Sequence, residues 1–221
     1  MVGDKSVRIS ILGGTGPEGR GLAVRLAMAG NAVCLGSRDE SRAIDVAIDL
    51  SSSVGIHVIG LDNASAAKDG DVIFVTVPYQ AQSDLLSSIK DDLEGKIIVN
   101  VIAPMEFVKG VGARALDVEA GSAAEECREI ACNSKIVSAF QNVSAEDLEN
   151  PDLVLDEDVI ICSDDPDAKK IVMELVESID NLRPVDGGAL SNSKYVEQIT
   201  PLLVNINRIY KIHAGIKIVG I

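Results

Sequence analysis

The chain has 221 residues, and 34 acidic against 20 basic residues leave a net charge of −14. This balance argues against nucleic acid as a partner, because nucleic-acid binding needs a basic face, and no apolar run approaches the length of a membrane span. Apolar residues make up 47% of the sequence, with three Phe, three Tyr and no Trp, an aliphatic composition typical of a parallel sheet covered by helices.

Strands and helices alternate along the chain. Apolar, β-branched runs predict strands over residues 7–12, 32–35, 55–61, 71–77, 96–101, 136–140, 159–162 and 182–185. Periodicity and capping residues predict helices over 17–28, 39–50, 81–89, 122–130, 166–179 and 192–210, with a helical turn from Asn63. The alternation indicates an α/β fold with a Rossmann-type doubly wound parallel sheet. The acidic segment 142–156 looks irregular, so we expect a Rossmann domain over 1–145 and a small C-terminal α/β domain over 146–221.

A glycine pattern follows the first strand directly, as Gly14-x-Gly16-x-x-Gly19, and Pro17 suits the first position of the helix that comes next. In a strand–turn–helix unit of this kind, Gly14 permits the turn and Gly16 lets the backbone approach a pyrophosphate. Gly19 lets the helix pack close to the strand. The position of the pattern therefore predicts a dinucleotide site.

The end of the second strand indicates which dinucleotide binds. NAD-binding sheets usually carry Asp or Glu there for the ribose hydroxyls, whereas this chain reads Gly36-Ser37-Arg38, with Arg42 one helical turn further on. A hydroxyl and two guanidinium groups suit a 2′-phosphate, which favours NADP(H). The alternative is a solvated surface on which the arginines form ion pairs with Asp39, Glu40 or Asp45.

Acid–base chemistry is poorly supported by the sequence. His57 lies in a predicted strand and His213 near the C-terminus, neither in a His–Asp pattern, and no tyrosine has Lys four residues on. A hydride can instead pass from nicotinamide to a flavin-like ring that delocalises the charge, and such a reaction mainly needs two stacked rings. We therefore assign no catalytic acid or base.

The cysteines and histidines do not form a metal-binding pattern. The four cysteines contain no Cys-x-x-Cys pair, and two histidines do not complete a zinc site with them. We expect no metal, reduced thiols and a cytoplasmic protein without a signal peptide. The cysteines are Cys34, Cys127, Cys132 and Cys162.

Several segments resemble the NADPH-dependent reductases of coenzyme F420, a deazaflavin. They cover almost the whole chain, and the Leu-Arg-Pro and Leu-Ser-Asn-Ser runs are more specific than the glycine turn. The matching segments are 11–16 (Ile-Leu-Gly-Gly-Thr-Gly), 36–39 (Gly-Ser-Arg-Asp), the turn at Pro78, Asp164-Asp165, 182–188 (Leu-Arg-Pro-Val-Asp-Gly-Gly), 190–193 (Leu-Ser-Asn-Ser), 200–202 (Thr-Pro-Leu) and 215–217 (Gly-Ile-Lys).

The resemblance implies reversible hydride transfer between NADP(H) and F420, a deazaflavin bound between an NADP-binding domain and the C-terminal domain, and a homodimer. By position it places the pyrophosphate at Thr15 to Glu18 and the 2′-phosphate at Ser37, Arg38 and Arg42. Around the nicotinamide it places Val77, Pro78, Tyr79, Ala103, Ala145 and Ala214.

This chain departs from the family resemblance at Tyr79, where one member of the family carries Trp, and at Gln141, where that member carries His. Both residues lie where the acceptor ring is expected. The departures keep open an NADPH-dependent reductase of another acceptor, such as a flavin, ferric ion or a cyclic imine. A non-catalytic NADP(H) redox sensor is a further alternative.

Two further segments have two interpretations each. Ser191 and Asn192 either bind the deazaflavin tail or, in the case of Ser191, cap the last helix. The apolar run over residues 200–209 is either dimer surface or core.

Overall fold

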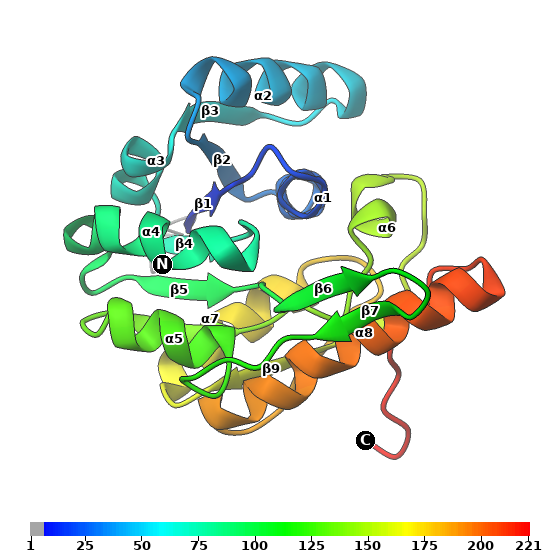
Figure 1. The fold of residues 1–221 in the computed structure, drawn as a ribbon. Helices are drawn as coiled ribbons and strands as arrows, with labels where there is room; N and C mark the ends of the chain where they lie inside the picture. Colours follow the sequence, from blue (N-terminus) through cyan, green and yellow to red (C-terminus); the bar gives the residue numbers. More distant parts are fainter. Residues whose placement is uncertain (1–6) are drawn as a thin grey trace.

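Eight strands form one sheet in the computed structural model, which describes residues 7–221 (Figure 1). In spatial order they are β10 (Leu182–Asp186), β9 (Glu157–Ser163), β8 (Lys135–Ser138), β5 (Ile97–Asn100), β4 (Val72–Val75), β1 (Arg8–Leu12), β2 (Ala32–Ser37) and β3 (Val58–Asp62). Neighbouring strands run parallel except β8 and β9, which are antiparallel. The predicted Rossmann-type sheet is confirmed, with one reversal of direction.

The order of the strands fixes where a ligand can bind. The chain runs outward from β1 to β2 and β3, and then returns to β4 on the other side of β1. At such a switch point the crevice outside the carboxyl ends of the strands is open to a ligand. The ends of β1 and β4 are therefore the place to look for the site.

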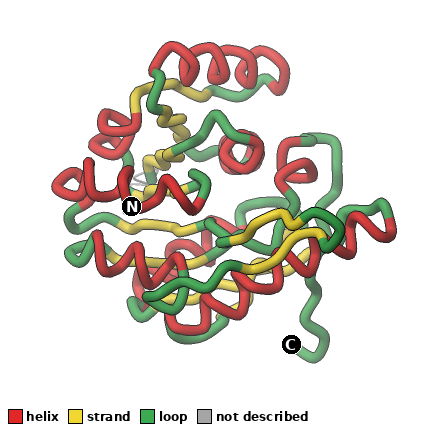
Figure 2. Tube along the Cα trace, viewed as in Figure 1, coloured by secondary structure: helices red, strands yellow, loops and turns green. Residues whose placement is uncertain are grey.

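Helices cover both faces of this sheet (Figure 2). One core cluster joins the sheet to α1 (Pro17–Met28), α2 (Glu40–Val54) and α7 (Pro166–Glu177). The other joins it to α3 (Asn63–Asp69), α4 (Tyr79–Ile89), α5 (Ala123–Ile130) and the short 3₁₀ helix η1 (Lys90–Leu93). Successive strand residues alternate between the two faces: Phe74 belongs to the first cluster, and its neighbours Ile73 and Val75 belong to the second.

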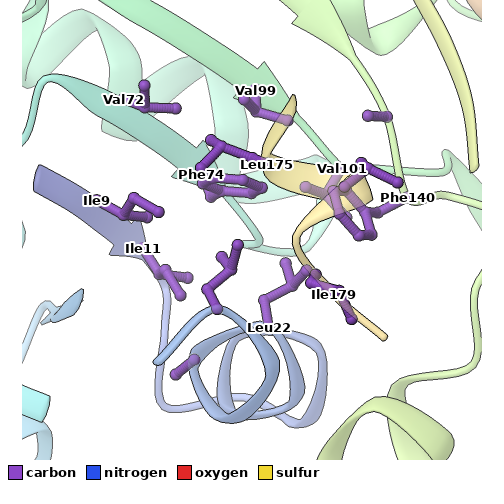
Figure 3. Close-up of a cluster of buried hydrophobic side chains, with 14 of the residues drawn as sticks. Ile9, Ile11, Leu22, Val72, Phe74, Val99, Val101, Phe140, Leu175 and Ile179 are labelled. Carbon is purple, nitrogen blue, oxygen red and sulfur yellow. The ribbon is translucent and has the colours of Figure 1, made fainter. Parts of the chain in front are cut away.

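Two phenylalanines anchor the core beside the site. Phe74 of β4 and Phe140, just after β8, lie with ring centroids 5.9 Å apart in a tilted arrangement. Figure 3 shows both rings on the side of the sheet that Leu22 of α1 covers, with Ile9 and Ile11 alongside. This packing fixes the loop after β8 against the body of the sheet.

The C-terminal third adds to the same sheet through β9 and β10. A separate hairpin, β6 (Met105–Val108) with β7 (Gly112–Ala115), lies along α8 (Ser193–Tyr210) (Figure 1). Asn205 of α8 holds it through two bonds to the backbone of Ala113, of 2.9 and 2.8 Å. The division into domains over 1–145 and 146–221 stays a prediction.

Two elements were not expected from the sequence. The hairpin lies in a glycine-containing stretch whose strands are four residues each, and α6 (Ala145–Glu149) is a five-residue helix inside the segment 142–156. Both are too short to show a period. The 3₁₀ helix η2 (Leu190–Asn192) precedes α8. Among the described residues, no helix has both the length and the apolar character needed to cross a membrane.

Candidate functional site

A tight glycine turn joins β1 to α1. Gly13 adopts the left-handed conformation (φ +74°), and its carbonyl accepts from the Gly16 N–H at 3.1 Å. A Cβ on Gly14 would lie 2.7 Å from the Leu35 side chain, and one on Gly19 would lie 2.5 Å from the Gly14 Cα. The conformational role expected of Gly14 therefore belongs to Gly13, because Gly14 is needed for close packing instead. Gly19 packs on the turn itself.

The first turn of α1 is open to a ligand. Gly16 is the N-cap residue and offers no side chain, while Pro17 lies in the first turn, as predicted. A Cβ on Gly16 would meet only the Gly13 carbonyl, at 3.6 Å, so the space beyond this residue is free. Unsatisfied N–H groups and the helix dipole make such an N-terminus suitable for a pyrophosphate.

Two guanidinium groups mark one end of the site, beside the carboxyl end of β2. Arg38 and Arg42 are exposed, and within residues 7–221 neither has a carboxylate within ion-pair distance. Asp39 caps α2 by accepting from the Arg42 N–H, and its own N–H donates to the Ser37 hydroxyl. The alternative of paired surface arginines does not hold. Both side chains are available for a phosphate.

A cleft of about 1480 Å³ extends from these arginines across the ends of β1 and β4 to α6 and the end of α8. This volume exceeds the ~300–1,000 Å³ of a pocket for one drug-sized ligand, which leaves room for two ring systems. Of the residues named in the sequence analysis, the cleft brings together Thr15, Gly16, Pro17, Glu18, Ser37, Arg38, Arg42, Val77, Pro78, Tyr79, Ala103, Gln141, Ala145 and Ala214.

Four other residues that the sequence assigned to ligand binding do not line the cleft. Gly14 and Gly19 lie beneath the turn, where they permit its packing. Ser191 and Asn192 lie in η2, whereas the part of α8 that lines the cleft begins only at Thr200, two turns further on. Asn192 donates to the Gly187 carbonyl at 2.8 Å, and Ser191 does not occupy the N-cap position of α8.

The loop after β8 turns sharply into the cleft. Phe140 is fully buried with φ +72°, a conformation that is unfavourable for a bulky residue and that clusters at functional sites. The turn directs the chain so that Gln141 lies in the cleft wall. The Gln141 amide donates to the Asn100 carbonyl at 2.8 Å and to the Ser138 hydroxyl at 2.9 Å, while its Oε1 is buried with no partner among the described residues.

Tyr79 forms the opposing aromatic part of the wall. It is the first residue of α4, half-buried, and packs against the second core cluster. Its hydroxyl donates to Glu126 Oε1 of α5 at 3.2 Å. Burial raises the pKa of the Tyr79 phenol, and the negative charge of Glu126 raises it further.

Two carboxyl groups without partners are buried where the glycine turn meets β9. Glu18 Oε1 and Glu157 Oε2 are buried and accept no hydrogen bond from the described residues. Burial raises the pKa of Glu18 to about 8, and the like charge of Glu157 adds to the effect. Burial, followed by the charge of Asp147, raises the pKa of Glu157 to about 7. Near neutral pH this pair therefore holds a proton, which limits the negative charge beside the phosphate turn.

A His–Asp pair borders the cleft at its far end. His213 Nδ1 and Asp147 Oδ1 are 2.5 Å apart, and His213 Nε2 lies 3.1 Å from Glu146 Oε2. The bond to Asp147 raises the pKa of the imidazole. The partners are 66 residues apart in the chain, so no short sequence pattern connects them.

Two asparagines that line the cleft were not predicted as site residues from the sequence. Asn63 accepts from the Gly13 N–H at 3.3 Å and so braces the glycine turn. Asn207 accepts from the Ala214 N–H at 2.7 Å and fixes the loop after α8. Asn63 follows directly after β3, where residues of a parallel sheet approach a ligand, and that position was the available signal.

An open glycine turn, an unpaired cationic end and a cleft with aromatic and apolar walls define a dinucleotide-dependent oxidoreductase of the Rossmann class. Comparisons narrow this class. The model of a family described as NADP oxidoreductase, coenzyme F420-dependent, matches residues 8–104. A protein of Methanocaldococcus jannaschii named F420-dependent NADP reductase is 40% identical over 214 residues, covering 93% of this chain and 94% of that protein.

A protein of the same name from Methanothermobacter marburgensis is 39% identical over 222 residues, covering 97% of this chain and 99% of its own. The chain therefore belongs to the F420-dependent NADP reductase family. A crystal structure of a putative F420-dependent NADP-reductase from Arthrobacter sp. FB24 superposes with a TM-score of 0.84 over 97% of this chain and 100% of its own. Since that pair shares only 22% identity, it supports the fold alone.

Proposed function

We propose that this protein transfers a hydride reversibly between NADP(H) and coenzyme F420. The observation that carries the NADP half is the pair of unpaired guanidinium groups beside Ser37, at one end of a cleft large enough for two ligands. The F420 half is supported by membership of the family, since the relatives named above match along nearly their whole length.

Each part of the cleft has a role in this proposal. The N–H groups after Gly16 bind the pyrophosphate, and Ser37, Arg38 and Arg42 bind the 2′-phosphate. The nicotinamide lies among small or apolar residues at the strand ends, on α6 and in the loop after α8, and the acceptor ring lies beside Tyr79 and Gln141. The nicotinamide residues are Val77, Pro78, Ala103, Ala145 and Ala214.

The contribution of the chain to the reaction is alignment and exclusion of water. Bound NADPH supplies the hydride, and the deazaflavin ring takes up the charge that the hydride brings. Thr76 secures the end of β4 through a 2.9 Å bond to the Leu12 carbonyl, so Val77 and Pro78 are held at a fixed height in the wall. Holding two rings in a reactive arrangement is a large part of the rate enhancement for such a step.

Turnover with a defined acceptor tests this proposal. Purified protein is expected to oxidise NADPH only when F420 is added, with loss of the visible absorbance of the deazaflavin. A flavin, ferric citrate and a cyclic imine serve as competing acceptors in the same assay. Faster NADPH oxidation with one of these, and no reduction of F420, would contradict the F420 assignment.

We also propose that the protein is a homodimer. Tyr195, Leu202 and Ile209 recur every seven residues on α8 and are 63%, 55% and 71% exposed, and Phe107 of the adjacent hairpin is 74% exposed. An apolar surface of this kind favours association. Light scattering is expected to give twice the chain mass, and Leu202→Asp to reduce it to one chain. We expect the cytoplasm as the compartment, since all four cysteines are free.

A further inference from the structure

A chain of hydrogen bonds runs through the interior behind the aromatic wall of the cleft. It joins α4, β5 and α5 through Gln82 and Asn100, which are both fully buried. Asn100 Nδ2 donates to Gln82 Oε1 at 2.6 Å, and Gln82 Nε2 donates to Glu126 Oε2 at 2.6 Å and to the Ala123 carbonyl at 3.1 Å. Buried side-chain amides are costly unless they are bonded, so this network specifies one arrangement.

Followed from donor to acceptor, these hydrogen bonds end at Glu126. A carboxylate only accepts, so its two oxygens receive the Tyr79 hydroxyl and the Gln82 amide. Gln82 is held at both ends of its amide, since its oxygen accepts from Asn100. Glu126 is thus fixed in place from the interior. Of the side chains that meet at Glu126, Tyr79 is the one that stands in the cleft wall.

The network also reaches the second polar residue of the cleft. The Asn100 backbone carbonyl accepts from Gln141 Nε2 at 2.8 Å, and the Asn100 side-chain oxygen accepts from the Ile102 N–H at 3.1 Å. Tyr79 and Gln141, the two departures from the family pattern, therefore both attach to Asn100, one through Gln82 and Glu126 and the other directly.

We propose that Glu126 is a positioning residue for the acceptor half of the reaction: by holding the Tyr79 hydroxyl from behind, it fixes the position of the ring against which the acceptor ring stacks. Glu126 itself does not line the cleft. Its effect passes through one bond, so it acts on the acceptor and not on the NADP-binding end at Ser37 and Arg38. This inference rests on the proposed function, because the acceptor measured is F420.

Four variants test the role of Glu126. Glu126→Ala is expected to raise the KM for F420 about five- to twentyfold while the Kd for NADPH stays within about twofold. Tyr79→Phe, which lacks the hydroxyl, is expected to give a similar rise. Adding Glu126→Ala to Tyr79→Phe is expected to change little more, because both substitutions remove the same bond. Glu126→Gln retains the size and an oxygen acceptor and is expected to restore most of the loss.

Glu129→Ala is the matched control. Glu129 lies one turn further along α5 and is exposed, and its side chain makes no hydrogen bond or ion pair with another described residue. It removes the same charge from the same helix, and it is expected to leave both constants unchanged. The proposal would be overturned if the increases in KM for F420 caused by Glu126→Ala and Tyr79→Phe multiplied in the double variant. A parallel loss of NADPH affinity would also overturn it.

A measurement without co-substrate separates this inference from the proposed function. The chain has three tyrosines and no tryptophan, and Tyr195 and Tyr210 are both exposed. The Tyr79 phenol, whose pKa is raised, is expected to ionise last in an ultraviolet titration. Glu126→Ala is expected to lower that last step, and Glu129→Ala to leave it in place. An unchanged last step in Glu126→Ala would overturn the inference even if F420 turnover holds.

Discussion

Arg38 and Arg42 combine exposure with the absence of an acidic partner in the described chain, beside the buried Ser37. A charge-assisted bond to phosphate contributes roughly 1.5–3 kcal/mol, or about ten- to a hundredfold in affinity. We therefore expect Arg38→Ala to weaken NADPH binding by about that factor and to leave NADH binding nearly unchanged. Isothermal titration of both nucleotides measures this. Equal weakening of the two would contradict the assignment of the 2′-phosphate.

Glu157 links stability to pH. Its folded-state pKa of about 7 lies above the ordinary 4.5, because it is buried and faces Asp147. Between pH 4.5 and 7 the folded chain retains a proton on Glu157 that the unfolded chain releases. The contribution of Glu157 to the free energy of unfolding is therefore full below pH 4.5 and is lost as the pH rises to 7.

Glu157→Gln removes this titration. At pH 8 the variant is expected to be about 1–3 kcal/mol more stable than the parent, and near pH 4.5 the difference should vanish. Urea denaturation across this range measures the effect, with Glu177→Gln on the exposed end of α7 as the control. A constant difference at all pH values would show that Glu157 does not titrate in this window.

At the scale of elements, α1 clamps the loop that carries α6. The buried Arg25 side chain donates to four backbone carbonyls at 2.5–3.0 Å, and these belong to Asp147, Leu148, Asn150 and Leu153. Gly21 of α1 faces Leu148 of α6, and a Cβ on Gly21 would lie 2.6 Å from the Leu148 side chain. The close approach of α1 and α6 therefore positions Ala145 in the cleft.

Arg25→Met keeps much of the side-chain volume and removes the guanidinium N–H groups that bond these four carbonyls. Carbonyls left without partners cost about 1–3 kcal/mol each where they remain buried, so we expect a loss of about 2–4 kcal/mol in the free energy of unfolding. Hydrogen exchange is expected to rise first in residues 145–153. Lys170→Met, at an exposed position of α7, is the control. Uniform faster exchange throughout the chain would contradict a local clamp.

Local pattern was sufficient for the longer elements and insufficient for contacts made across the chain. The helix starts at Pro17 and Asp165 and the end at Gly30 follow from neighbouring residues, and they are confirmed. Asn100, Gln82 and Glu126 come from three separate elements, so no spacing in the sequence connects them. The left-handed conformation of Phe140 could not be predicted from the sequence either, because no neighbouring residue requires it.

At the scale of the whole molecule, the doubly wound sheet followed from the alternation of strands and helices, whereas the order of its strands is known only from the structure. The residues assigned from the sequence, from Thr15 to Ala214, make up only part of the cleft wall. The sequence did not predict that β9 pairs with β8 in the opposite direction. An amphipathic or buried strand has the same pattern in either direction, so its orientation depends on tertiary packing.

The reversal at β9 has a consequence for engineering. Because β9 runs against β8, its first residue, Glu157, lies at the same edge as the last residues of the parallel strands and beside Glu18 of α1. One of these two acids is thus encoded early in the gene and the other late. A chimaera that exchanges the C-terminal third would replace the neighbourhood of Glu157 and leave Glu18 in its own, so the residues at both positions have to be chosen together.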